Sequence, residues 1–432
     1  MFPKKVGDAS LGAEDDKFVI APGLPKNDPD PTILYMHTDW CRPMACDDIP
    51  LDNPDPWIAA KPQATKGRGA VSNLAGRFET QVIETVDDGW QRLPEDSDIS
   101  PELRTSVTPE YAKTILSRNQ SPDLPFSVSL NPYRGCEHGC VYCFARPTHA
   151  YLGLSPGLDF ETRLYAKLNA PELLRQALAV HHYQVSPIAL GINTDAYQPC
   201  ERELRLTRRC LEVLHECEHP VGVITKSALI ERDIDLLQDM ARNNLVAAAL
   251  TITTLNHQVA RTLEPRAASP TRRLQAMEKL ARAGIPVLVS VAPVIPFITE
   301  QELENVLQAA ASAGATAAGY TVLRLPWEVN PLFQEWLQTH FPERAQRVMN
   351  RIRDMRGGKD YQASFGSRMR GEGLWADLIR QRFAKALKRY GLDKSGNRAG
   401  ELDCHRFRKP RHIPTQVEKP RPSDKGQLDF FG

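Results

Sequence analysis

From residue 126 onward, short apolar segments alternate with longer stretches that have the periodicity of amphipathic helices. Strands are predicted at 126–130, 187–193, 221–227, 246–254, 286–294 and 315–325, and helices near 171–182, 202–217, 230–244, 270–283 and 300–313. Parallel strands need a crossover connection, which is normally helical. The chain is therefore predicted to be an α/β protein whose residues 126–330 form a partial, TIM-like (β/α)6 barrel with helices on its outer face.

Helix boundaries are marked in two of these stretches. Ser269 precedes a proline and is suited to cap the helix that follows, and Thr299 with Glu302 has the spacing of a capping box. Gly284 and Gly314 stand where the helices should end.

The remainder of the chain divides by composition. Residues 1–65 are rich in Pro and Asp and are predicted to form a loosely ordered extension. Residues 66–125 are an accessory segment that begins with a glycine-rich stretch at 66–79, suited to a loop against a phosphate or against the core. A basic helical region is predicted at 331–400 and a disordered basic tail at 401–432.

Length and composition favour a soluble enzyme. The chain has 432 residues, 41% of them hydrophobic, which is enough for one large core with a smaller attachment. No apolar run reaches the ~20 residues that span a bilayer, and the N-terminus lacks the apolar segment of a signal peptide. Nine irregularly spaced cysteines suit a reducing compartment, so a cytoplasmic location without membrane contact is expected.

Three cysteines lie close together directly after the first predicted strand. Cys136, Cys140 and Cys143 are separated by four and three residues. They supply one ligand too few for a closed tetrahedral zinc site or for an iron–sulfur cubane held entirely by protein. An exogenous ligand is therefore expected at the fourth position, with the ring of Tyr142 beside it. Gly135 and Gly139 would let the backbone wrap tightly around the metal.

Two other interpretations of these cysteines stay open. They could belong to a zinc site that borrows His138 or His149, or they could be three unrelated buried thiols.

The CxxxCxxC spacing, with an aromatic residue before the last cysteine, resembles the signature of the radical S-adenosylmethionine (SAM) superfamily. The resemblance implies that Cys136, Cys140 and Cys143 bind a [4Fe-4S] cluster whose fourth iron chelates SAM. It also implies that one electron, delivered by an external donor of the flavodoxin or ferredoxin type, splits SAM into methionine and a 5'-deoxyadenosyl radical.

Five further motifs are similar to those of radical SAM proteins related to spore photoproduct lyase, the DNA repair photolyase group, over about residues 66–400. The motifs are Asn131-Pro-Tyr-Arg-Gly-Cys, Asn193-Thr-Asp, Thr225-Lys-Ser, Leu263-Glu-Pro-Arg and Val291-Ala-Pro-Val-Ile-Pro. The resemblance implies a lyase acting in DNA repair. It places seven residues at the SAM site: Tyr142, Phe144, Asn193, Thr194, Asp195, Lys226 and Thr251.

The polar residues among these seven stand where predicted strands end. The carboxyl ends of barrel strands meet at one face, and a zwitterionic cofactor with a ribose needs acceptors for its ammonium and hydroxyl groups and a cation for its carboxylate. Asn193, Thr194 and Asp195 follow the second strand, Lys226 follows the third, and Thr251 ends the fourth. Each alone could equally be a turn residue, but together they predict a cofactor site.

One position departs from the lyase pattern. In that family a cysteine directly before the Thr-Ser-Asp triplet returns hydrogen to the product radical, whereas this chain has Ile192 there. Cys200 is the candidate catalytic substitute, although a helix-flanking thiol is the favoured interpretation. Cys210 and Cys217 lie seven apart on one predicted helix and are expected to pack as small hydrophobic residues.

Charge is distributed unevenly despite a net charge of +1. Residues 1–62 hold 6 Lys and Arg against 11 Asp and Glu, whereas residues 342–432 hold 22 against 11. A basic C-terminal third suggests a nucleic-acid partner, or else a solvated helical surface. The segment Gln427–Phe431 resembles the short peptide that docks bacterial repair proteins on the sliding clamp, although its aromatic ending differs from the usual Leu-Phe.

Three functions therefore compete. The first is a radical SAM enzyme that repairs or modifies nucleic acid, and the second is a radical SAM enzyme acting on a small molecule or a peptide. The third is a non-catalytic iron–sulfur protein that binds nucleic acid.

Overall fold

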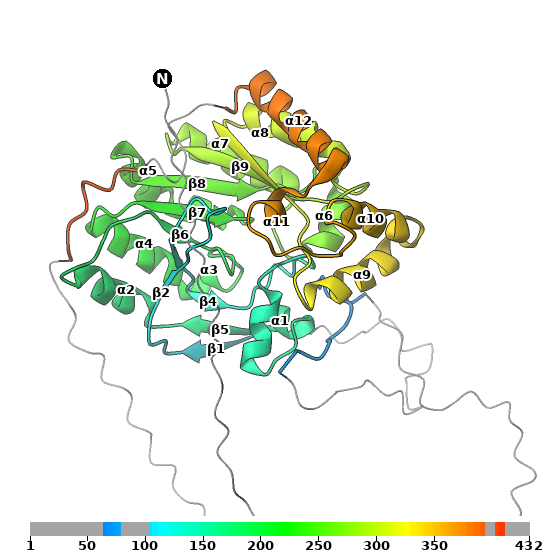
Figure 1. The fold of residues 1–432 in the computed structure, drawn as a ribbon. Helices are drawn as coiled ribbons and strands as arrows, with labels where there is room; N and C mark the ends of the chain where they lie inside the picture. The colour runs from blue at the N-terminus through cyan, green and yellow to red at the C-terminus, as the bar shows by residue number, and fades with distance from the viewer. Residues whose placement is uncertain (1–63, 79–102, 394–401, 411–432) are drawn as a thin grey trace, which may run out of the picture. The chain divides into compact units, whose positions relative to one another are not determined.

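The computed structural model describes residues 64–78, 103–393 and 402–410, all of which belong to one compact unit. Its main sheet has the order β10-β9-β8-β7-β6-β3-β2 (Figure 1). Six strands run parallel and in chain order, and β2 (Leu116–Arg118) pairs antiparallel with β3 at the edge. The parallel strands are β3 (Val128–Leu130), β6 (Ile188–Leu190), β7 (Val221–Thr225), β8 (Val246–Thr251), β9 (Val287–Val294) and β10 (Ala317–Val322). The predicted partial (β/α)6 arrangement is confirmed.

Helices follow the parallel strands and cover them. They are α2 (Ala170–Ala179), α3 (Glu201–Leu204), α4 (Leu206–Glu216), α5 (Ile234–Arg242), α6 (His257–Leu263), α7 (Pro270–Arg282) and α8 (Leu303–Ser312). In this layer α2 lies against α4, α4 against α5, and α7 against α8. The predicted helix at 202–217 is broken because Arg205 adopts a left-handed conformation, with φ of 51°. The predicted helix at 230–244 begins as a 3-10 turn, η3 (Ala228–Asp233).

The structure confirms one of the two predicted helix caps and contradicts the other. Ser269 accepts a hydrogen bond from the Arg272 amide at 3.3 Å, as a cap should. The predicted capping box at Thr299 is wrong. The Thr299 hydroxyl accepts from the amide of Ile295 and donates to the carbonyl of Pro293, while Glu302 accepts from Thr254. The Thr299 hydroxyl serves the loop after β9 and Glu302 serves the segment after β8, because buried polar groups in these loops need hydrogen-bond partners.

A second, smaller sheet was not predicted. It has the order β1-β5-β4, formed by β1 (Ser106–Glu110), β5 (Arg163–Lys167) and β4 (Tyr133–Arg134). Between β4 and β5 lie the cysteines, a 3-10 helix η2 (Arg146–Leu152), and α1 (Leu158–Thr162). The sheet therefore clamps both ends of the segment that carries the cysteines.

The C-terminal part is helical as far as it is described. It contains α9 (Val329–His340), α10 (Pro342–Asp354), α11 (Ser367–Arg370) and α12 (Gly373–Tyr390). Helix α12 packs against α8 and so extends the outer layer of the main sheet, whereas α10 packs against α9 (Figure 1). None of the helices in the described ranges is both long and apolar enough to cross a membrane.

Residues 402–410 are placed against the barrel, which corrects the prediction of disorder for this stretch. The ring of Phe407 lies 5.5 Å from that of Tyr183 and 5.3 Å from that of His219. The Arg408 amide donates to the carbonyl of Cys217 at 2.8 Å. One aromatic side chain and a few backbone hydrogen bonds are enough to hold this otherwise charged stretch. The segments 1–63 and 411–432, the second of which contains Gln427–Phe431, lie outside the described residues.

Cys210 and Cys217 are fully buried in the core of the main sheet, which confirms that they pack as small hydrophobic residues.

His219 should make stability depend on pH. Burial lowers its pKa from 6.5 to about 4, while its Nδ1 pairs with the carbonyl of Pro220. Below pH 6.5 His219 is protonated in the unfolded chain, but in the folded protein it stays neutral until the pH approaches 4. The free energy of unfolding should therefore fall as the pH drops from 6.5 toward 4, by about 2 kcal/mol at pH 5. Urea unfolding at pH 7 and pH 5 measures this loss.

The His219→Gln variant should lose that part of the pH dependence. The matched control is His182→Gln, at a histidine that is exposed in the folded protein. Equal pH dependence in His219→Gln and in the wild type would contradict the assignment.

Candidate active site

The three cysteines lie on one tightly turned loop between β4 and η2. Cys136 and Cys140 are buried, and Cys143 is partly exposed. The Cys143 amide donates to the carbonyl of Cys140 at 3.2 Å, and the amide of Gly139 donates to the carbonyl of Cys136 at 3.3 Å. The three thiols are close enough to interact electrostatically with one another. We call residues 135–143 the cysteine loop.

Glycine is required at both predicted positions of this loop. Gly135 and Gly139 have φ of 72° and 68°, a region that disfavours residues with a Cβ atom. A Cβ atom on Gly135 would lie 2.7 Å from the side chain of Leu164, and one on Gly139 would lie 2.7 Å from that of Glu161. The loop is thus packed closely on α1 and β5.

A buried ion pair supports the loop from beneath. Arg146 and Glu161 are both fully buried, and their nearest charged atoms are 2.5 Å apart. Arg146 also donates to the carbonyls of Cys140 at 2.9 Å and of Gly139 at 3.2 Å. Two carbonyls of the cysteine loop are thereby fixed. The sequence analysis missed this pair, for which the only signal was an arginine three residues past the last cysteine.

The described part of the glycine-rich stretch, residues 66–78, contacts the core, which is one of the two roles predicted for it. The carboxylate of Glu161 accepts hydrogen bonds from the amides of Gly69 at 3.0 Å and Ala70 at 2.8 Å. A Cβ atom on Gly69 would lie only 1.8 Å from the carbonyl oxygen of Gly139. Residues 64–78 therefore brace the cysteine loop (Figure 1).

On its other side the loop pairs with the segment after α6. The Val141 amide donates to the carbonyl of Leu263 at 3.2 Å, and the amide of Arg266 donates to the carbonyl of His138 at 3.2 Å. Between these two contacts stands Glu264, which is buried. The cysteine loop is therefore held by backbone hydrogen bonds as well as by the brace.

Glu264 is the centre of a charged network that reaches Tyr142. Its carboxylate accepts from the hydroxyl of Thr253 at 2.6 Å and from that of Tyr142, and forms an ion pair with the buried Arg273. Burial alone would raise the pKa of Glu264, but Arg273 and Lys226 outweigh it and lower the pKa. The glutamate is therefore ionised, and it orients the ring of Tyr142 next to Cys143.

Asp195 joins the ends of two strands to the cysteine loop. Its carboxylate accepts from the Thr225 hydroxyl at 2.6 Å and from the Lys226 amide at 2.7 Å. Nδ1 of His138 lies 3.3 Å from the same carboxylate, without hydrogen-bond alignment. Burial opposes ionisation of Asp195, but His138 and the hydrogen bonds outweigh it and lower the pKa.

The ammonium group of Lys226 faces the cysteine loop from the end of β7. It lies 5.8 Å from the centre of the Tyr142 ring and interacts electrostatically with Cys140, Glu264 and Asp195. Burial would lower the pKa of Lys226, but Cys140 and Glu264 outweigh it and raise the pKa. Among the described residues no carboxylate is within ion-pair distance of this ammonium group. Lys226 is therefore a cation available to an anionic ligand.

The thiols themselves need a cation to ionise. Burial raises the pKa of Cys140 to about 12, although Lys226 partly offsets the effect, and burial also raises the pKa of Cys136. Bound metal overcomes such a penalty because a coordinating thiol is deprotonated outright. Three clustered thiols, of which Cys136 and Cys140 have raised pKa values, fit an iron–sulfur cluster beside the half-buried cation of Lys226.

The remaining predicted residues lie in different surroundings. The amide of Asn193 donates to the side chain of Asn131 at 2.8 Å, and the buried Thr194 contacts the carbonyl of Tyr133. Thr251 is buried, and its carbonyl accepts from Arg273 at 2.9 Å. Phe144 is 42% exposed, beneath the guanidinium of Arg324. Tyr142, Asp195, Lys226 and Thr251 are thus brought together, and Phe144 stands at the edge.

Cys200 lies apart from these hydrogen bonds. It packs with Tyr133 and Leu206, and burial raises its pKa to about 12. Gln198, which also follows the second predicted strand, is more closely tied to the site. Its side chain accepts from the Glu137 amide at 2.9 Å and donates to the carbonyl of Gly135 at 3.3 Å.

Each histidine that a zinc site would borrow has one ring nitrogen near an oxygen atom, while Nδ1 of both lacks an aligned hydrogen-bond partner among the described residues. His138 faces Asp195, and Nε2 of His149 lies 3.0 Å from the carbonyl of Arg163. In the ranges that the structure describes, no three His, Cys, Asp or Glu side chains are grouped around a position for a single ion.

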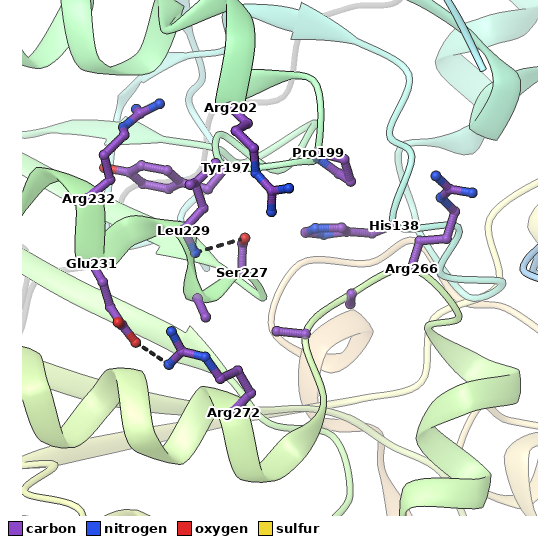
Figure 2. A pocket seen from close by; sticks show the side chains of 13 residues that line it. His138, Tyr197, Pro199, Arg202, Ser227, Leu229, Glu231, Arg232, Arg266 and Arg272 are labelled. Carbon is purple, nitrogen blue, oxygen red and sulfur yellow. Dashed lines mark hydrogen bonds and ion pairs between the residues drawn. The ribbon is translucent and has the colours of Figure 1, made fainter. Parts of the chain in front are cut away.

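A pocket of about 490 Å³ with four arginines in its wall opens beside the cysteine loop. Figure 2 shows His138 pointing into it, toward Ser227 and Arg202. Three of its four arginines are paired with carboxylates: Arg272 with Glu231, Arg232 with Glu201, and Arg266 with Glu137. The charges of the pocket wall are therefore largely balanced.

Comparison with known proteins gives a family match across the barrel. The model of the Radical SAM superfamily matches residues 130–310. The uncharacterized protein Rv2578c of Mycobacterium tuberculosis is 33% identical over 272 residues, which cover 62% of this chain and 76% of that protein. The uncharacterized protein MJ0683 of Methanocaldococcus jannaschii is 27% identical over 173 residues, 40% of this chain and 62% of that protein.

Similar solved structures are more remote. Spore photoproduct lyase complexed with dinucleoside spore photoproduct has a TM-score of 0.48 at 15% identity, covering 66% of this chain and 79% of that one. The radical SAM methyltransferase TsrM of Kitasatospora setae has a TM-score of 0.36 at 13% identity, covering 57% and 44%. Similarity this remote assigns no substrate to the chain.

Replacing Gly69 should loosen the brace. In Gly69→Ala the new Cβ atom collides with the carbonyl of Gly139, so residues 64–78 must move off the cysteine loop. The free energy of unfolding should fall by about 1–3 kcal/mol, the usual cost of overpacking. Urea denaturation measures the change. Gly319→Ala is the matched control because its Cβ atom would meet nothing within 4 Å. Equal unfolding midpoints for the two variants would contradict the brace.

Proposed function

Because this chain belongs to the radical SAM superfamily, we propose that Cys136, Cys140 and Cys143 hold a [4Fe-4S] cluster with one iron left for SAM. The protein is a radical SAM enzyme, and the family requires SAM and an iron–sulfur cluster. When bound and reduced, this cluster supplies the electron that splits SAM into methionine and the 5'-deoxyadenosyl radical. The observation that carries the proposal is the grouping of three buried or half-buried thiols with Tyr142 and Lys226 at the carboxyl ends of the strands.

The side chains around the loop are suited to a zwitterionic ligand. We propose that the ammonium group of Lys226 binds the carboxylate of SAM and that the ionised Asp195 positions the ligand's ammonium group. Asn193, Thr194 and Thr251 line the same strand ends, and Tyr142 and Phe144 supply aromatic surface. Asp195 has a second task, since its hydrogen bonds hold the end of β7 against the cysteine loop. Cys200 is retained as a candidate hydrogen donor only if it leaves its packed position.

We propose nucleic acid as the substrate, in lesion repair or modification. Residues 342–393 carry 13 Lys and Arg against 6 Asp and Glu, and 22 against 11 are present over 342–432. This excess favours a polyanionic partner over a small molecule or a peptide. A cytoplasmic location, an electron donor of the flavodoxin or ferredoxin type, and docking of Gln427–Phe431 on the sliding clamp complete the proposal.

The radical mechanism is tested by anaerobic reconstitution with iron and sulfide. Dithionite and SAM should then release 5'-deoxyadenosine, and replacing any of Cys136, Cys140 or Cys143 by alanine should abolish both the cluster's absorbance and the product. Cys210→Ala is the matched control, since it removes a buried thiol from the core and should keep both. An intact cluster that releases no 5'-deoxyadenosine would leave only the non-catalytic, nucleic-acid-binding alternative.

The substrate class is tested by the salt dependence of binding. Contacts with phosphates release counterions, so the logarithm of the affinity for DNA should fall linearly with the logarithm of the salt concentration. Fluorescence anisotropy with labelled single-stranded and duplex oligonucleotides between 50 and about 200 mM salt gives this slope. Removing the tail after residue 410 separates the tail's contribution to DNA binding from that of the helices. The absence of binding at low salt would favour the small-molecule or peptide alternative.

A further inference from the structure

Three large aromatic side chains are exposed on neighbouring segments of the molecule. Phe78 is 56% exposed at the end of the brace, Tyr151 is 67% exposed on η2, and Trp327 is 63% exposed in the turn between β10 and α9. Large aromatic rings normally bury most of their surface, so this exposure is unfavourable unless a ligand covers it.

One guanidinium group holds these rings together. That of Arg77 lies 4.2 Å from the centre of the Trp327 ring, 5.3 Å from that of Phe78 and 5.8 Å from that of Tyr151. The rings of Phe78 and Tyr151 are 5.1 Å apart and tilted by 33°. Arg77 is in turn fixed by an ion pair of 2.7 Å with Glu328. We call Arg77, Phe78, Tyr151 and Trp327 the aromatic platform.

The backbone of Trp327 is in an unfavourable conformation. Its φ is 47°, in the left-handed region that bulky residues rarely adopt. Glycine or asparagine would fit this turn better, and the exposed ring contributes little to the core. A strained backbone that presents an exposed aromatic ring is a feature of binding sites more than of structural turns.

The platform borders the proposed active site. Tyr151 lies on the 3-10 helix that follows Cys143, and Trp327 lies three residues past Arg324, whose guanidinium covers the ring of Phe144. Phe144 directly follows the last cysteine of the loop. A ligand that covers the platform would thus run along the edge of the strand ends where the radical forms.

We infer that the aromatic platform stacks unpaired bases of a single-stranded nucleic acid, and so guides the strand to the active site. This inference rests on the proposed action on nucleic acid. Flat aromatic rings interleaved with an arginine present the surfaces on which single-stranded bases stack, independently of sequence. Paired bases in a duplex hide those faces. The platform therefore selects a single strand, or a base turned out of a duplex, over an intact duplex.

Binding of two oligonucleotides with the same phosphate charge tests the inference. The full chain is titrated with a fluorescent 15-residue thymidine strand and with the matching abasic strand. The thymidine strand should bind more tightly, and Trp327→Ala and Tyr151→Ala should each weaken its binding by about 10- to 100-fold, given the strength of base–aromatic stacking. Neither variant should change binding of the abasic strand.

Three further variants separate stacking from structure. Trp327→Phe keeps a ring and should keep most of the affinity. Trp327→Gly removes the ring but relieves the left-handed backbone, so its unfolding midpoint should be no lower than that of the wild type while its affinity falls. Tyr111→Ala is the matched control, because Tyr111 is 58% exposed but is not part of the platform.

The outcomes distinguish this inference from the proposed function. Equal binding of the thymidine and abasic strands, or unchanged thymidine binding in Trp327→Ala, would overturn the platform and leave the nucleic-acid function in place. Failure of both strands to bind would overturn the nucleic-acid function itself. Release of 5'-deoxyadenosine without any oligonucleotide reports on the radical chemistry independently of both results.

Discussion

The buried pair of Arg146 and Glu161 is the interaction on which the site depends. Neither side chain has contact with solvent, and together they bind the carbonyls of the cysteine loop and the amides of the brace. Removing one member would leave an uncompensated buried charge, which typically costs about 3–5 kcal/mol. A charge pair of this kind contributes less to stability than to geometry, since it allows only one arrangement of the loop, α1 and residues 64–78. The cysteines are therefore positioned by polar contacts in addition to their packing in small hydrophobic clusters, Cys136 with Phe160 and Cys140 with Leu263.

The buried charged side chains around the thiols are compensated by partners of opposite charge or by hydrogen bonds. Glu264 stays ionised because Arg273 and Lys226 lie near it, and Asp195 stays ionised because of His138 and its hydrogen bonds. These two carboxylates link Tyr142 and Lys226 to the ends of β8 and β7. Lys226, without a carboxylate partner of its own in the described ranges, gives the site one cation that a ligand can use. The protein thus combines a rigid set of internal pairs with one free charge at the strand ends.

Prediction from the sequence succeeded where periodicity and spacing carry the information. The six parallel strands followed from apolar segments separated by helical stretches, and the tight turns at Gly135 and Gly139 followed from the glycines beside the cysteines. Prediction failed where a side chain has several possible hydrogen-bond or packing partners. Thr299 has the spacing of a helix cap, but its hydroxyl forms hydrogen bonds with the backbone of the loop after β9. Phe407 lies in a basic stretch that was expected to be disordered, but its ring packs against those of Tyr183 and His219.

The sequence alone determined the partial barrel, the position of the cysteine loop after its first strand, and the radical SAM signature, because these depend on local pattern and on fixed spacing along the chain. Only the tertiary structure decided what surrounds the thiols. Glu161, Glu264 and the brace at 64–78 come from distant parts of the sequence, as do the rings of Phe78, Tyr151 and Trp327. Burial and charge compensation act between atoms that are close in space, and no local pattern records which distant residues will meet.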